Sequence, residues 1–381
     1  MKELETIVTE AERARTAGKP AALATVVGIE GSAYRLPGAR MLIVDGRWTA
    51  GSISGGCLED DVVLRAAEAI ARGEALVTTY DTTSDDDIVF GVGLGCKGVI
   101  TILIEPIRAP GEAVDLLSFA TTCITNRIGG VVATVIRTHG ALAAKPGERL
   151  LLAGASAVSD VEDAGLAQAM RKAAHAAPAG SAELVTIELE HGSAEIFVER
   201  LEPPTPLVVF GAGHDTMPIV RLAKELGWHV TVIDHRPAYA TSSRFPQADR
   251  IVVCAPKDVP EQGVLTDDTL ALVMTHNYLR DLDLLEVLLP SPVRYLGLLG
   301  PRRRNEQLLA DLRSRGIEPT VEQLSRLYAP VGLDVGSETP AEVALSILSE
   351  MQAVMTDHRG GHLRARKRPI HQPETAVCAV A

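Results

Sequence analysis

The chain has 381 residues, more than one hydrophobic core usually serves, and its 46% hydrophobic and 23% charged residues are an ordinary globular composition. A formal net charge of −12 argues against a general nucleic-acid binder, and no apolar run approaches the roughly 20 residues of a membrane helix. Five scattered cysteines and a charged N-terminus without an apolar core favour a cytoplasmic protein of two or three domains.

The first hundred or so residues alternate between helical and strand periodicity. Residue spacing predicts a helix over 2–17, strands over 21–28 and 40–45 with a hairpin turn at Asp45-Gly46, a helix over 58–71, and strands over 75–80 and 99–105. This order indicates an α/β unit that ends at Pro106.

The unit is then repeated. Residues 23–44 align without gaps on 132–153, and Glu105-Pro106 can be matched to Glu202-Pro203. Residues 1–203 are therefore predicted to be a duplicated α/β domain, with repeats over about 21–106 and 130–203 that pack together.

A bare loop precedes the second predicted helix. It contains Gly55, Gly56 and Cys57, so that one thiol is placed where the helix begins. A helix start favours anions and thiolates, but three acidic residues follow at once, which indicates placement of a thiol and not strong activation. The loop alone is equally compatible with a buried structural cysteine behind a tight turn.

The second repeat serves as an internal control. It keeps the strands, the turn residues and Arg149 at the position of Arg40, but it lacks Gly-Gly-Cys, Tyr34 and the stretch 91–98 that contains Cys96. If Cys57 and Cys96 served only packing, the second repeat would need similar residues. The difference favours function for the two cysteines and a structural role for Arg40.

A proline-rich linker at 202–206 precedes a strand, a glycine turn, a helix and a second strand over 207–236. This is the start of a Rossmann-like parallel sheet, with Gly211 in the tight turn, Gly213 near a phosphate and Asp234 placed to bind a ribose hydroxyl. Thr216 replaces the third glycine, and His214 is not needed in a plain nicotinamide site. The pattern predicts the fold and only weakly predicts NAD(P).

Further strand–helix units extend this domain to residue 356. His214, His276 and the corner 300–304 each follow a predicted strand, at the edge where parallel sheets bind ligands. Arg302 and its two neighbours could clamp a phosphate or could form a solvated helix face, and His276 could be a hydrogen-bonded loop residue. A helix is expected over 340–355 and a disordered tail over 357–381.

Several motifs taken together resemble the XdhC/CoxI (CoxF) family of maturation factors for molybdenum hydroxylases such as xanthine dehydrogenase and carbon monoxide dehydrogenase. They are GSISGGCLEDDV, GVGLGC, FGAGHDTMP, DHRP, MTHN and GLDVGSETPAEVALSIL, within about residues 10–355. The resemblance implies binding of molybdenum cofactor, protection of its sulfurated form and delivery to an apo-hydroxylase. It also implies a cysteine desulfurase as partner and a homodimer. Lys97 stands where some relatives have glycine, so the client enzyme stays open.

The chemistry of this cofactor agrees with the residues singled out above. It is a pterin with a phosphate and a dithiolene that holds molybdenum, and soft thiolates suit a sulfur-bearing metal. We therefore expect Cys57, alone or with Cys96, to face the metal or its exchangeable sulfur. Gly211, Gly213 and Arg302 would bind the phosphate-bearing end. This describes a carrier and not a turnover enzyme.

Two rival functions follow from the same residues. One is an NAD(P)-dependent oxidoreductase that uses the C-terminal sheet and His276 as acid or base. The other is a sulfurtransferase in which Cys57 carries a persulfide.

Overall fold

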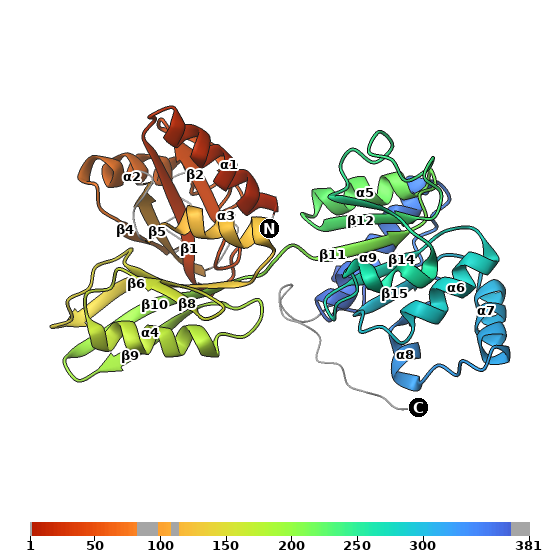
Figure 1. The fold of residues 1–381 in the computed structure, drawn as a ribbon. Helices are drawn as coiled ribbons and strands as arrows, with labels where there is room; N and C mark the ends of the chain where they lie inside the picture. The colour runs from red at the N-terminus through yellow and green to blue at the C-terminus, as the bar shows by residue number, and fades with distance from the viewer. Residues whose placement is uncertain (1, 82–97, 108–113, 367–381) are drawn as a thin grey trace. The chain divides into compact units, whose positions relative to one another are not determined.

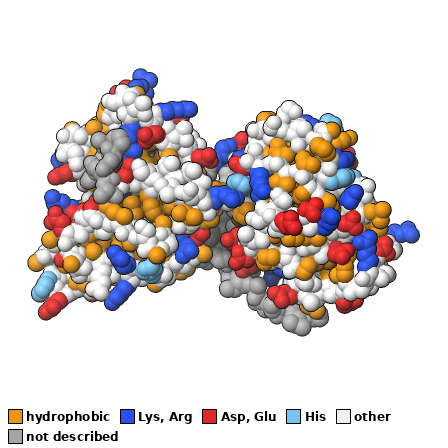
Figure 2. All heavy atoms as spheres, viewed as in Figure 1, with side chains coloured by type: hydrophobic (Ala, Val, Ile, Leu, Met, Phe, Trp, Pro, Cys, Tyr) orange, Lys and Arg blue, Asp and Glu red, His pale blue; other side chains and the backbone are white. Residues whose placement is uncertain are grey.

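The computed structural model describes residues 2–81, 98–107 and 114–366, which divide into two compact units, Met1–Pro203 and Pro204–Ala381 (Figure 1). No helix in these ranges is long and apolar enough to cross a membrane. Acidic and basic side chains are interspersed on the visible face of each unit (Figure 2).

The first half of the N-terminal unit is an antiparallel sheet with a helix on one face. Its strands lie in the order β3-β2-β1-β5-β4. They are β1 (Ala21–Gly31), β2 (Arg40–Val44), β3 (Arg47–Gly51), β4 (Leu76–Asp81) and β5 (Gly98–Pro106), and the helices are α1 (Lys2–Thr16) and α2 (Glu59–Arg72). Leu58, Val62 and Ala66 recur every four residues along α2 and its N-cap, and they pack against the buried side chains of the sheet.

The second half repeats this arrangement. Its sheet has the order β8-β7-β6-β10-β9, again with antiparallel neighbours. The elements are α3 (Leu116–Asn126), β6 (Gly130–Gly140), β7 (Arg149–Ala153), β8 (Ser156–Ser159), α4 (Ala164–Ala176), β9 (Ala182–Leu189) and β10 (Gly192–Leu201). The two halves therefore share one topology.

The strand register corrects one detail of the sequence alignment. Leu23 lies opposite Glu105, and its counterpart Val132 lies opposite Glu199. The glutamate equivalent to Glu105 is thus Glu199, and the match to Glu202 was wrong because it relied on the following proline.

Reciprocal ion pairs join the two halves. Arg40 of the first half donates to both carboxylate oxygens of Glu199, with Nη1 2.8 Å from Oε1, and Arg149 of the second half pairs with Glu105. The side chains of Arg40 and Glu199 are only 6% and 9% exposed. A small cluster of Val27, Leu103, Ile136 and Phe197 is shared by both sheets. The interface between the halves is therefore both apolar and ionic.

The C-terminal unit contains a six-stranded parallel sheet with the order β13-β12-β11-β14-β15-β16. The strands are β11 (Pro206–Phe210), β12 (His229–Asp234), β13 (Arg250–Val253), β14 (Leu270–Val273), β15 (Tyr295–Leu298) and β16 (Leu327–Tyr328). Numbered from its own first strand, this is the 3-2-1-4-5-6 order of dinucleotide-binding sheets. The predicted α/β class, with a Rossmann-like parallel sheet after the N-terminal domain, is confirmed.

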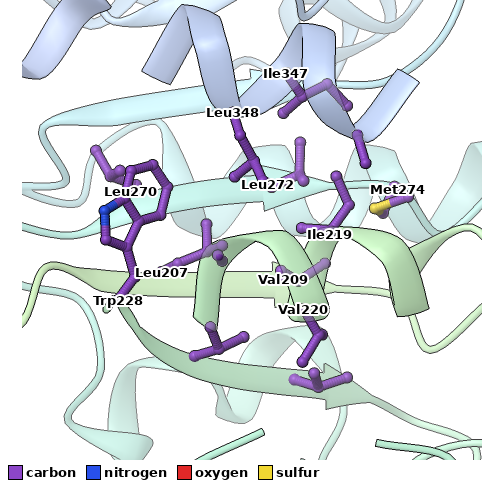
Figure 3. Packing of buried hydrophobic residues seen from close by; sticks show 14 of the residues in the cluster. Leu207, Val209, Ile219, Val220, Trp228, Leu270, Leu272, Met274, Ile347 and Leu348 are labelled. Carbon is purple, nitrogen blue, oxygen red and sulfur yellow. The ribbon is translucent and has the colours of Figure 1, made fainter. Parts of the chain in front are cut away.

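Helices cover both faces of this sheet. On one face lie α5 (Thr216–Glu225) and α9 (Pro340–Met355), and on the other α6 (Tyr278–Leu288) and α7 (Arg302–Ser314). Figure 3 shows Ile219 and Val220 of α5 and Ile347 and Leu348 of α9 packed with Leu207, Val209, Leu270 and Leu272 of the central strands. The short helix α8 (Val321–Ser325) precedes β16. The expected disordered tail falls mainly outside the described residues, which end in a 3₁₀ turn at Leu363–Ala365.

Replacing Arg40 by Met should destabilise the N-terminal unit by about 3–5 kcal/mol, because it leaves the Glu199 carboxylate buried without its partner. Urea denaturation measures the change. The half-exposed pair Arg137–Glu195 is the control, and Arg137→Met should cost less than about 1 kcal/mol. A double variant, Arg40→Met with Glu199→Met, should be more stable than Arg40→Met alone; equal or lower stability would contradict this role of the pair.

Candidate functional site

Residues 52–58, which contain Cys57 and are called the thiol loop below, connect β3 to the start of α2. The helix begins at Glu59 with Leu58 as its N-cap, so Cys57 stands just outside the first turn. Cys57 is exposed and its thiol is free, which excludes the alternative of a buried structural cysteine. Gly56 has φ of +106°, a conformation that side chains rarely adopt, so glycine is required there.

The Ser54 hydroxyl lies beneath this loop. Its Oγ accepts hydrogen bonds from the backbone N–H groups of Gly56, Cys57 and Leu58 at 3.1–3.2 Å and from the Cys57 thiol at 3.4 Å. The same hydroxyl donates to the carboxylate of Glu59. The loop is thus organised around one buried oxygen.

The Glu59 carboxylate completes the network. It is 2% exposed and accepts from the N–H groups of Ile53 at 3.3 Å, Ser54 at 2.9 Å and Leu58 at 3.2 Å. Burial alone would raise the pKa of Glu59, but the hydrogen bonds from Ser54 and from the backbone outweigh it, and the pKa lies below its usual value. Glu59 is therefore a buried anion that fixes both ends of the loop.

The backbone N–H groups at the start of α2 do not face outward. The sequence favoured free N–H groups there, which attract anions. Those of Gly56, Cys57 and Leu58 instead point inward to Ser54 and Glu59. The N–H groups of this loop are therefore used within the protein, and the group it offers to a ligand is the thiol of the exposed residue Cys57.

The loop between β1 and β2, which contains Tyr34 and Arg35, contacts the thiol loop. Arg35 donates to Ser52 Oγ at 3.0 Å and to Glu3 of α1 at 2.5 Å, and Glu3 also accepts from the Ser52 N–H at 3.1 Å. Tyr34 is 65% exposed, and its ring lies within van der Waals distance of the space above Gly55. Tyr34 was singled out from the sequence, whereas the supporting residues Glu3, Arg35, Ser54 and Glu59 were missed. The serine three residues before Cys57 was the only local signal.

The second repeat starts its helix in an ordinary way. The side chain of Asp163 caps α4 by accepting from the Leu166 N–H at 2.9 Å. A helix at this place in the fold thus does not need a cysteine loop. Cys96 and the stretch 91–97 lie outside the described residues, so the pairing of Cys57 with Cys96 stays a prediction.

In the C-terminal unit, the order of the strands reverses between β11 and β14: earlier strands are added on the β11 side and later strands on the β14 side. Ligands of such folds bind at this switch point. Gly211 is forced by close packing there, because a Cβ on it would lie 2.6 Å from the Met274 carbonyl oxygen. Thr216, at the usual third glycine position, donates to the Gly211 carbonyl at 2.7 Å and closes the turn.

A carboxylate occupies the space beside Gly213. A Cβ on Gly213 would lie 2.4 Å from Asp215 Oδ1, and the other oxygen of Asp215 is 2.5 Å from His276 Nε2. His276 has φ of +56° and is exposed, as is His214. The structure therefore brings Gly213 and His276 together through Asp215, at the place where a dinucleotide phosphate would be expected.

Asp234 is engaged within the protein. It is 5% exposed and accepts from the Ala212 N–H at 2.7 Å and from the Arg236 guanidinium at 2.7 and 3.0 Å. Burial would raise its pKa, but the hydrogen bonds from Arg236 and Ala212 lower it. Asp234 ties the glycine turn to the end of β12, so its oxygens are not free for a ribose hydroxyl here.

Arg302 and Arg304, in the corner formed by residues 300–304, lie in different environments. The Arg302 side chain is 82% exposed, 3.9 Å from Glu306, whereas Arg304 bonds the buried carboxylate of Asp281 at 2.6 Å. A cavity of about 390 Å³ is lined by Arg304, His276 and Gly300. The described part of the chain shows no group of three His, Cys, Asp or Glu side chains suited to a metal.

The comparisons with known proteins agree with these two units. The profile of the XdhC and CoxI family matches residues 14–81, and that of the XdhC Rossmann domain matches 207–351. A protein of Bacillus subtilis described as a probable subunit of xanthine dehydrogenase is 34% identical over 336 residues, 87% of this chain and 92% of the relative. The chain belongs to the XdhC and CoxI family.

Two further matches cover most of this chain and most of the matched protein. The molybdenum cofactor insertion chaperone PaoD of Escherichia coli is 25% identical over 92% of this chain and 88% of its own. The crystal structure of a xanthine dehydrogenase from Bacillus halodurans superposes with a TM-score of 0.72 at 27% identity, covering 95% of this chain and 97% of that one.

Exposure of Cys57 predicts selective alkylation of this family member. Under native conditions iodoacetamide should modify Cys57 at least about tenfold faster than Cys123, which is 1% exposed in α3. Peptide mass spectrometry at increasing times gives both rates in one sample. Equal rates would mean that the loop buries its thiol in solution.

Glu59→Gln should destabilise the N-terminal unit by about 1–3 kcal/mol at pH 7, because the amide presents an N–H₂ group to backbone donors. The wild-type pKa is depressed, so the contribution of the ionised form exists above the unfolded pKa and is lost as pH falls through the folded pKa. The difference between the two proteins in urea denaturation should therefore shrink below about pH 4. A difference that grows in acid would contradict this assignment.

Proposed function

We propose that this protein binds molybdenum cofactor as cargo and delivers it to a molybdenum hydroxylase of the xanthine dehydrogenase type. The observation that carries the proposal is the exposed thiol of Cys57, held by a buried Ser54–Glu59 network in one repeat only. Support also comes from the relatives, one named for xanthine dehydrogenase and one named as a molybdenum cofactor insertion chaperone.

The thiol loop suits this cargo chemically. The cofactor carries molybdenum on sulfur ligands, and a cysteine thiolate is a soft ligand for such a centre. Gly55 and Gly56 are exposed and place no side chain of their own beside Cys57. The exposed ring of Tyr34 against Gly55 offers a flat surface on which a pterin can stack.

The sulfurated form of the cofactor gives the thiol a second task. Cys57, with Cys96 if that residue lies near, would contact the exchangeable sulfur and protect it until delivery. A cysteine desulfurase would supply this sulfur, and a homodimer would carry two such loops. In the alternative sulfurtransferase route, Cys57 itself would hold the sulfur as a persulfide, which mass spectrometry after incubation with a desulfurase detects.

The rival NAD(P)-dependent oxidoreductase gains no support from the C-terminal unit. Asp234 is bonded to Arg236 and Ala212, and the Asp215 carboxylate lies beside Gly213. A dinucleotide would have to displace both arrangements. We therefore keep the carrier as the proposed function.

Cys57→Ser should lower cofactor retention at least about tenfold, because a hydroxyl is a poor ligand for a sulfur-bound metal. The test is the molybdenum and pterin content of protein purified from cells that make the cofactor. Cys254→Ser, at a half-buried cysteine of the C-terminal unit, is the matched control and should retain cofactor like wild type. Undiminished retention by Cys57→Ser would overturn the role of this thiol.

A further inference from the structure

A second cavity, of about 850 Å³, lies at the carboxyl edge of the parallel sheet. Its walls are the first turns of α5 and α9 and the loop between β12 and β13. The side chains that matter for its chemistry are His214, Met217, Arg221, Arg244, Phe245 and Pro340. The volume is within the range of small-molecule sites, and the edge is the one that parallel sheets use for ligands.

Arg244 provides the strongest indication of a ligand. Its guanidinium stacks on Tyr239 at 4.9 Å and donates from Nη1 to the Tyr239 carbonyl at 3.2 Å. Its Nη2 atom is buried and has no hydrogen-bond partner within the described residues. A buried guanidinium nitrogen rarely stays unsatisfied in a protein, so a missing acceptor is expected beside it.

Arg221 and His214 are two further polar side chains in the lining of this cavity. Within the described part of the chain, neither Arg221 nor His214 has a carboxylate within ion-pair distance, in contrast to Arg304. Three acids close in sequence to the cavity residues are bonded elsewhere: Asp215 to His276, Asp249 to Lys224, and Glu342 to backbone N–H groups at the start of α9. The described residues that line the cavity thus include two arginines and no carboxylate.

We propose that this cavity binds a small molecule that carries a phosphate on a heterocyclic ring. Arg221, Arg244 and His214 would hold the phosphate, since guanidinium groups match its oxygens with paired hydrogen bonds. Met217 and Pro340, which are both partly exposed, give the ring an apolar contact. The phosphate contact that the sequence suggested for Arg302 is thereby moved to the opposite face of the sheet, which carries α5 and α9.

Two sources share this chemistry, a nucleotide and the pterin of molybdenum cofactor. Calorimetric titration of the full-length protein with AMP, and separately with molybdopterin, distinguishes them, and adenosine shows what the phosphate contributes. At least one phosphate-bearing probe should bind, and loss of its phosphate should weaken binding at least about tenfold.

Arg221→Met and Arg244→Met should each weaken binding by a similar factor, as expected for a charged hydrogen bond. Arg302→Met, which removes an exposed arginine of α7 outside this cavity, is the control.

Binding of AMP would identify a nucleotide site, and binding of molybdopterin alone a cargo site; either supports the cavity if both cavity variants lose affinity. Circular dichroism checks folding, and the exposed Arg221 keeps the test valid if Arg244→Met is damaged. Absence of binding by both probes, unchanged affinity of Arg221→Met, or loss confined to Arg302→Met would overturn the inference. The molybdopterin outcome rests on the proposed function, whereas the nucleotide outcome does not: AMP binding should persist in Cys57→Ser even if that variant retains cofactor like wild type.

Discussion

The thiol loop depends on one buried negative charge. Removing a carboxylate from water is costly unless its lone pairs are satisfied, and Glu59 satisfies them with three backbone N–H groups and the Ser54 hydroxyl. Those donors come from both sides of Cys57, so the same bonds that stabilise the anion fix the position of the sulfur. Ile53 and Leu58 anchor the two ends of the loop in the core, whereas Gly55, Gly56 and Cys57 between them are exposed.

Duplication explains how the fold tolerates this exposed loop. Each half of the N-terminal unit buries a helix against its own sheet, and the reciprocal pairs Arg40–Glu199 and Arg149–Glu105 lock the halves together. Stability is thereby provided by features present twice. The loop of Cys57 is present once, and the second half replaces it with an ordinary cap at Asp163. The fold can therefore start this helix without a cysteine, which favours a functional role for Cys57.

The C-terminal unit has the strand order of a dinucleotide-binding sheet but different chemistry at its switch point. Asp215 and His276 join the ends of β11 and β14, where a phosphate would lie in a typical member of the fold. Beside α5 and α9, in contrast, Arg221 and Arg244 line a cavity to which the described residues contribute no carboxylate. The fold is shared with nucleotide-binding proteins, whereas the arrangement of charges is its own.

The sequence by itself determined the fold class, the start of α2 behind Cys57 and the family, because hydrophobic spacing, glycine turns and motifs are local properties. Helix α9 was predicted over the residues it occupies, owing to Pro340 and a clear apolar period. Only the tertiary structure decided which polar atoms meet: that Glu59 turns inward, that Asp234 is taken by Arg236, and that Glu199 pairs with Arg40. The Arg40–Glu199 pair joins residues 159 positions apart in the chain, so only the packing of the two halves brings them together. Glu59–Ser54 and Asp234–Arg236 are close in the sequence, but the order of residues there does not determine whether these carboxylates turn into the protein or toward solvent.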